Sequence, residues 1–192
     1  NLTGKKVFDI GCGDGVYSLQ LFAKGGPKSI LAIDPSVEAI RAAKKNNPFS
    51  RKVTFKVGNI YSLPKEKFDI AIVRGVLHHL YQPEKAMRQI SKVAEKVLII
   101  EPNGYNPALK VIEKISKYHI EHEEKSYPPC LIDQWIKNNS GTIKFRKFAG
   151  LVPFFCPDHL ASLLKRAEPI IEKIPFLNEI VCAQYYVVYD LK

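Results

Sequence analysis

Three glycines at alternate positions, Gly11, Gly13 and Gly15, stand between a short apolar run and a segment with helical periodicity. Glycine at such a turn accepts backbone angles that a Cβ would forbid, and it lets a ligand lie on the main chain. The amides that open the following helix then face that ligand. A second apolar run ends in Asp34. This position is close to the ~20-residue offset from the glycine loop at which an acidic side chain binds the ribose in dinucleotide folds. This order predicts a nucleoside-binding site rather than an ordinary structural turn.

The spacing of the glycines also restricts which nucleoside binds. A dinucleotide fingerprint reads G-x-G-x-x-G and places a pyrophosphate on the helix N-terminus. Here Asp14 lies among the glycines, and a carboxylate repels a pyrophosphate at close range. Asp14 suits a ligand that carries an amino group or a sulfonium, so the pattern argues against a nicotinamide oxidoreductase.

On these residues the chain resembles the class I S-adenosylmethionine-dependent methyltransferases, whose first motif reads much like residues 9–15, DIGCGDG. The resemblance implies S-adenosylmethionine as cofactor and S-adenosylhomocysteine as product. It implies that Asp34 takes the ribose hydroxyls, that Asn59 and Ile60 hold adenine, and that Tyr17 covers the sulfonium side. The family commonly has Asp at the position of Asn59, whose side-chain oxygen can still accept a hydrogen bond. The cofactor-binding residues implied in this way are Asp9, Gly11, Cys12, Gly13, Gly15, Tyr17, Asp34, Pro35, Asn59, Ile60, Arg74 and Gly75.

Catalysis of methyl transfer depends mainly on holding donor and acceptor in line in dry surroundings, worth as much as ~7–11 kcal/mol. A general base is needed only when the acceptor must lose a proton. His78 and His79 are the candidate bases, because histidine titrates near neutrality and both follow the fourth predicted strand. Packing on the sheet or capping of a backbone group is their alternative role. Glu101 is a further candidate base, with a loop hydrogen bond or a helix cap as its alternative.

The sequence favours a small-molecule or lipid-like acceptor. Enzymes that methylate exocyclic base amines usually carry a Pro-Pro-aromatic turn after strand four, where residues 74–77 read RGVL. Cytosine-C5 enzymes use a cysteine after a proline, and the pair at 129–130 follows strand five, which is the wrong place. An RNA-directed methyltransferase and a non-catalytic S-adenosylmethionine-binding module remain the alternatives. The aromatic residues that would line an acceptor pocket are Tyr105, Tyr118, Tyr127, Trp135, Phe154 and Phe155.

The formal net charge of +10 raises the question of an anionic partner. Residues 1–100 hold 17 Lys and Arg against 8 Asp and Glu, whereas residues 101–192 hold 12 against 11. The surplus therefore lies in the half that would bind the cofactor, spaced out along predicted helices and loops. We interpret most of it as a solvated face.

Neither the cysteines nor the histidines form a pattern typical of a metal site. The histidines His119 and His122 have helical spacing, but the charged residues around them predict a solvated face. No apolar run approaches the ~18 residues that cross a bilayer. We expect a cytoplasmic protein without metal and with free thiols. The four cysteines are Cys12, Cys130, Cys156 and Cys182.

Five predicted strands alternate with helices, which gives a parallel sheet with right-handed crossovers. Two later strands are expected to pair as an antiparallel C-terminal edge. The expected fold is one Rossmann-like, doubly wound α/β domain over residues 1–192, with seven strands and three layers, α/β/α. Residues 105–140 are predicted to be a helical insertion near the substrate pocket, and an N-terminal cap over the cofactor is expected to precede Asn1. The predicted strands are 7–10, 30–33, 53–57, 68–73, 97–100, 142–148 and 181–189.

Overall fold

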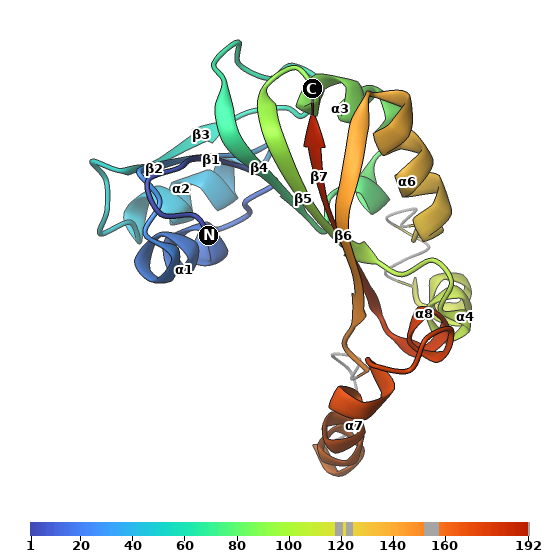
Figure 1. The fold of residues 1–192 in the computed structure, drawn as a ribbon. Coiled ribbons are helices and arrows are strands. Elements are labelled where there is room, and N and C mark those ends of the chain that lie inside the picture. The colour runs from blue at the N-terminus through green and yellow to red at the C-terminus, as the bar shows by residue number, and fades with distance from the viewer. Residues whose placement is uncertain (118–120, 122–124, 152–157, 192) are drawn as a thin grey trace.

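The computed structural model describes residues 1–117, 121, 125–151 and 158–191. Its centre is a seven-stranded sheet in the order β3-β2-β1-β4-β5-β7-β6 (Figure 1). Strands β1 to β5 are parallel, while β7 runs antiparallel to both β5 and β6. The strands are β1 (Lys6–Ile10), β2 (Ser29–Asp34), β3 (Val53–Val57), β4 (Phe68–Arg74), β5 (Ala94–Pro102), β6 (Gly141–Ala149) and β7 (Gln184–Leu191).

The helices begin where local chemistry favours a helix start. The Ser36 Oγ accepts a hydrogen bond from the Ala39 N–H at 3.1 Å and caps the second helix. Proline occupies the first turn of three others, where its missing N–H costs nothing. The described helices are α1 (Val16–Gly25), α2 (Val37–Lys45), the short 3-10 helix η1 (Leu77–His79), α3 (Pro83–Ile90), α4 (Pro107–Ile115), α6 (Pro129–Asn138), α7 (Asp158–Ile171) and α8 (Leu177–Val181).

The central strands are buried on both faces. Along β1, Val7 packs into a core cluster with residues of α2, while Phe8 and Ile10 pack into a second cluster with residues of α3 and α6. This alternation follows from the period of two in a strand. A parallel sheet covered on both sides explains why its strands read as nearly continuous apolar runs. The expected three-layer, Rossmann-like architecture is confirmed.

The C-terminal part differs in detail from the prediction. The final strand was expected from residue 181, but 177–181 form α8 and β7 begins at Gln184. Strand β7 lies between β5 and β6, so the antiparallel edge also pairs with the parallel part of the sheet. Neither η1 nor α8 was predicted, because helices this short carry no periodic signal. In Figure 1, α7 lies apart from the sheet, beyond the ends of β6 and β7.

Several sequence predictions concern segments that the structure does not describe. Tyr118, His119, His122, Phe154, Phe155 and Cys156 lie outside the described residues. Among the described cysteines, Cys12 and Cys182 are buried free thiols and Cys130 is exposed. In the described chain, no cluster of side chains could hold a metal ion, and no helix is long and apolar enough to cross a membrane.

Candidate active site

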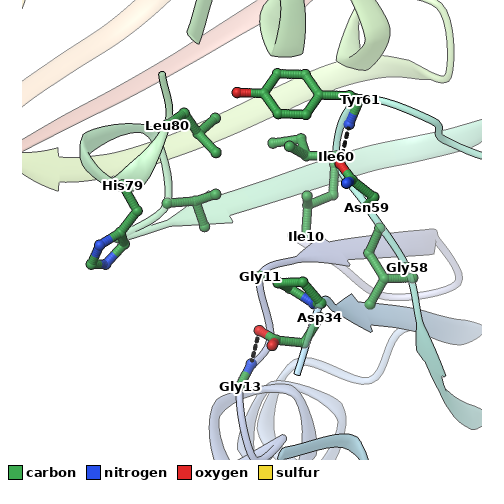
Figure 2. Close-up of a pocket in the computed structure, with 14 residues that line it drawn as sticks. Ile10, Gly11, Gly13, Asp34, Gly58, Asn59, Ile60, Tyr61, His79 and Leu80 are labelled. Carbon is green, nitrogen blue, oxygen red and sulfur yellow. Dashed lines mark hydrogen bonds between the residues drawn. The ribbon is translucent and has the colours of Figure 1, made fainter. Parts of the chain in front are cut away.

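A cavity of about 410 Å³ lies at the carboxyl ends of β1 to β4. The strand order reverses between β1 and β4, and ligands of open α/β sheets bind at such a switch point. We call this space the first cavity, and Figure 2 shows the residues around it. It is lined by Ile10, Gly11, Gly13, Ile33, Asp34, Pro35, Gly58, Asn59, Ile60, Tyr61, Gly75, Val76, His79 and Leu80.

The Asp34 carboxylate joins the glycine loop to the start of α2. Its Oδ2 accepts the Gly13 N–H at 2.9 Å, drawn as a dashed line in Figure 2, and its Oδ1 accepts the Ser36 N–H at 2.9 Å. A carboxylate oxygen has two acceptor positions. Each oxygen of Asp34 therefore retains one position for a ligand hydroxyl.

The three glycines of the loop have positive φ angles of +79°, +56° and +79°. A Cβ on Gly15 would lie 2.6 Å from the Phe55 ring, and a Cβ on Gly11 would overlap Val76. A Cβ on Gly13 would meet nothing within 4 Å. Gly11 and Gly15 are thus required by packing, whereas Gly13 leaves open space above its backbone for a ligand.

The far end of the first cavity is formed by the turn after β3. The Asn59 Oδ1 accepts the Tyr61 N–H at 2.9 Å, as Figure 2 shows. Ile60 is buried in the core beside it. The Asn59 amide is thereby held in place, and its oxygen keeps one acceptor position for a polar edge of a bound base.

A second cavity, of about 520 Å³, adjoins the first. Among the described residues that line the two, Gly75 alone is common to both. The guanidinium of Arg74 stands over the Tyr17 ring, 4.1 Å from the ring centroid. The second cavity is lined by Tyr17, Arg74, Gly75, His78, Ile100, Glu101, Pro102, Gln184 and Tyr186.

Glu101 is the organising acceptor of the second cavity. Its Oε1 accepts the N–H groups of Val76 and Leu77, each at 2.8 Å. Its Oε2 accepts the His78 N–H at 3.3 Å and contacts the His78 Nδ1 at 2.8 Å. Because a carboxylate accepts, we place the ring proton of neutral His78 on Nδ1, which leaves Nε2 unprotonated. The helix-cap role considered for Glu101 is therefore confirmed, and the same side chain orients a histidine.

The two histidines stand at the boundary of the two cavities. The centroids of their rings lie 3.9 Å apart. His79 lines the first cavity and His78 lines the second. The structure thus brings both predicted histidines to the site, but on different sides of it.

Three predicted cofactor-binding residues, Asp9, Cys12 and Gly15, line neither of the two cavities. Asp9 is 2% exposed and accepts the Ser18 hydroxyl at 2.5 Å. Burial raises the pKa of Asp9 to about 6, against the lowering effects of Ser18 and then Arg74. Burial, with Asp9 and Asp34 nearby, raises the pKa of the Cys12 thiol to about 12. The side chains of Asp9 and Cys12 are thus buried in the protein interior rather than facing a ligand.

A family model described as "Methyltransferase domain" matches residues 1–146. The chain belongs to this family. With its fold, it is a class I methyltransferase domain, the class that uses S-adenosylmethionine. The open loop at Gly13, the free acceptor positions of Asp34 and a cavity within the ~300–1,000 Å³ of ligand sites fit that nucleoside.

The methyltransferase domain has curated relatives with different acceptors in their names. It is 36% identical over 93 residues to the tRNA U34 carboxymethyltransferase of Campylobacter concisus, covering 47% of this chain and 32% of that protein. It is 33% identical over 108 residues to the mitochondrial ubiquinone biosynthesis O-methyltransferase of Schizosaccharomyces pombe, covering 53% of this chain and 36% of that protein. The chain thus spans about a third of the length of these relatives.

Solved structures share the fold of the methyltransferase domain. Magnesium protoporphyrin IX methyltransferase from Synechocystis, solved with bound S-adenosylhomocysteine, matches with a TM-score of 0.68 at 17% identity, covering 100% of this chain and 76% of that one. A chain from a Haloferax volcanii complex between the Trm112 methyltransferase activator and a methyltransferase matches with a TM-score of 0.73 at 14% identity. The match covers 98% of this chain and 83% of that one.

Two residues of the second cavity come from a strand with no predicted part in the site. Gln184 and Tyr186 reach the second cavity from β7, far away in sequence. Of the predicted acceptor aromatics, Tyr127 and Trp135 line a third cavity of about 490 Å³, while Tyr105 lines none of the three. The third cavity is lined by Tyr81, Gln82, Pro83, Glu84, Lys85, Arg88, Tyr127 and Trp135.

Proposed function

We propose that the domain transfers a methyl group from S-adenosylmethionine to an oxygen of an RNA nucleoside. The observation that carries this proposal is the pair of adjoining cavities with a Glu101-oriented His78 in the second one. A donor nucleoside in the first cavity and an acceptor in the second would meet at Gly75. Such a two-molecule site is what an in-line transfer requires.

In the first cavity we assign the donor to the predicted cofactor residues that line it, whereas Tyr17 and Arg74, also predicted to bind the cofactor, line the second cavity. The ribose hydroxyls would donate to the free acceptor positions of Asp34, and the adenine would lie against Asn59 and Ile60. The main chain at Gly11 and Gly13 would lie along the rest of the cofactor. When bound, the cofactor supplies a sulfonium leaving group and the methyl.

In the second cavity we assign His78 as the general base. Its unprotonated Nε2 would take the proton of an acceptor hydroxyl, and Glu101 would stabilise the resulting imidazolium. The His78 side chain is 13% exposed, so little bulk water competes for the nitrogen. A hydroxyl acceptor must lose its proton as its oxygen attacks the methyl group, and it therefore needs such a base. For this reason we prefer an oxygen as the acceptor atom.

The RNA part of the proposal is supported by the third cavity. Tyr81 is 85% exposed, and Lys85 and Arg88 are exposed beside it. The Lys85 Nζ lies 5.6 Å from the centroid of the Tyr61 ring, which lines the first cavity. An exposed aromatic ring beside basic side chains is typical of surfaces on which unpaired bases stack, and Tyr81 is the exposed ring here.

A relative named for tRNA and the excess of basic residues over 1–100 also favour RNA. The sequence-based preference for a small molecule depended on missing motifs for base amines and for cytosine C5. Those motifs do not bear on an oxygen nucleophile. An RNA acceptor would also agree with the predicted cytoplasmic location.

A small-molecule hydroxyl is the second candidate acceptor, because one relative is named as an O-methyltransferase of ubiquinone biosynthesis. The experiment incubates the domain with S-adenosylmethionine carrying a tritiated methyl group and with either bulk tRNA or a set of phenols. We expect label in RNA, lost in a His78→Asn variant. Label confined to the phenols would favour the second candidate, and production of no S-adenosylhomocysteine with either would favour a non-catalytic binding module.

A further inference from the structure

Arg74 is the last residue of β4, and it lies in the second cavity next to the boundary with the first. Its guanidinium carbon is 4.1 Å from the centroid of the Tyr17 ring, well inside the range of a cation–π contact. Tyr17 stands in the first turn of α1, directly after the glycine loop. The ring therefore holds the cation at the wall of the cavity.

No carboxylate of the described chain neutralises this cation by direct contact. Within the described ranges, Arg74 has no acidic group within ion-pair distance. Asp9 is nearby but buried behind the loop, with Ser18 donating to it. Glu101 lines the same cavity, but its oxygens already accept three backbone N–H groups and contact the His78 ring.

The second cavity has the size and position for a molecule of its own. At about 520 Å³ it is no smaller than the first, and the two meet at Gly75. His78 and Arg74 both line it, one as an oriented imidazole and the other as a fixed cation. Anything bound there would meet a proton acceptor and a positive charge together.

We propose that Arg74, held on Tyr17, binds a phosphate of the RNA acceptor beside the nucleotide whose hydroxyl faces His78. The inference rests on the proposed function, since an RNA acceptor supplies the phosphate. The planar guanidinium offers two parallel donors that match the oxygens of a phosphate. Binding at this point would fix the register of the strand and leave the base edge free for other contacts.

The test compares Arg74→Gln with a matched control, Arg41→Gln, an exposed arginine on α2 that lines none of the three cavities. Binding of bulk tRNA is measured in the presence of S-adenosylhomocysteine at several salt concentrations. We expect Arg74→Gln to weaken tRNA binding at least fivefold. The slope of log Kd against log salt should fall by about 0.7–0.9, the loss of one phosphate contact. Arg74→Lys should retain the slope, and Arg41→Gln should retain the affinity.

Affinity for S-adenosylhomocysteine serves as the check on folding and on the first cavity. It should stay within twofold in Arg74→Gln, because Arg74 lines the second cavity and not the first, while KM for tRNA rises. Unchanged tRNA affinity and slope would overturn the inference. So would a loss of affinity for S-adenosylhomocysteine that is not seen with methylthioadenosine, because Arg74 would then bind the amino-acid end of the cofactor.

Failure of the proposed function gives a different result. A wild-type protein that binds S-adenosylhomocysteine but modifies no RNA would refute the RNA acceptor. Arg74 would then be tested with uridine 5′-monophosphate against uridine. A preference for the phosphorylated form that disappears in Arg74→Gln supports the anion subsite, and equal affinities in the wild type refute it.

Discussion

The His78 Nδ1 and the Glu101 Oε2 lie 2.8 Å apart, although the two residues stand 23 positions apart in the chain. Parallel pairing of β4 with β5 creates this contact, because Arg74 stands opposite Ile100. Glu101 follows Ile100 on β5, so it lies beside the point where the chain leaves β4 and enters η1. One carboxylate thereby caps a short helix and fixes the tautomer of a histidine.

Glu101→Gln should separate these two functions. The amide oxygen can still accept from Val76 and Leu77, but the amide N–H₂ would face His78 and favour the tautomer protonated on Nε2. We expect kcat to fall by about 10²–10⁴, the range of a lost general base. Affinity for S-adenosylhomocysteine should stay within twofold.

The matched control for that variant is Glu95→Gln, an exposed glutamate on the same strand β5. It should leave kcat unchanged. A Glu101→Gln protein with the wild-type kcat would refute the role assigned to His78.

Asp34→Asn should weaken cofactor binding. One of the two N–H groups that Asp34 accepts would face an amide N–H₂, and a ribose hydroxyl would lose a charged acceptor. Hydrogen bonds to charged groups contribute about 1.5–3 kcal/mol, so calorimetry with S-adenosylhomocysteine should show at least a ~10-fold loss. Asp14, which the sequence placed beside the positive charge of the ligand, is exposed, accepts the Val16 N–H and lines none of the three cavities, so Asp14→Asn should bind normally. Equal affinity in the two variants would contradict the ribose assignment.

Gly15→Ala should destabilise the fold more than Gly13→Ala. Both residues have positive φ, but only the Cβ at Gly15 would lie 2.6 Å from the Phe55 ring. Overpacking of this kind costs about 1–3 kcal/mol beyond the backbone strain that the two variants share. Urea unfolding measures the difference in free energy of unfolding. Replacing the ring by a smaller side chain, in the double variant Gly15→Ala/Phe55→Leu, should recover part of the lost stability. Equal losses at the two glycines would rule out the steric explanation.

Asp9 should make the domain less stable as the pH rises from about 4 to 6. Burial raises the pKa of Asp9 from 3.8 to about 6. Between these values the unfolded chain binds fewer protons at this residue than the folded one, so its contribution to stability is lost as the pH rises. A shift of this size corresponds to about 3 kcal/mol.

Asp9→Asn removes that dependence while keeping an acceptor for Ser18. The free energy of unfolding of Asp9→Asn relative to wild type should therefore increase between pH 4 and 6 and level off above it. Urea titrations at fixed pH values measure this difference. A difference that is constant across the range would show that Asp9 stays charged in the folded protein.

The sequence by itself determined the parallel sheet and the loop at its centre. Apolar runs and their alternation depend on neighbouring residues, which is why the bounds of β1 to β4 were predicted to within one residue. The positive φ angles at Gly11, Gly13 and Gly15 are likewise a local requirement that glycine meets. The position of Asp34 at the end of β2 was predicted from the same order of strand, helix and strand.

Only the tertiary structure decided how the second cavity is made. Its walls combine Tyr17 from α1, Arg74 from β4, Glu101 from β5 and Gln184 from β7. Which of these side chains meet depends on the order and register of the strands, and on the insertion of β7 beside β5. The strand order, the register and the place of β7 are not encoded in the spacing of neighbouring residues, because strand pairing is set by packing between segments far apart in the chain.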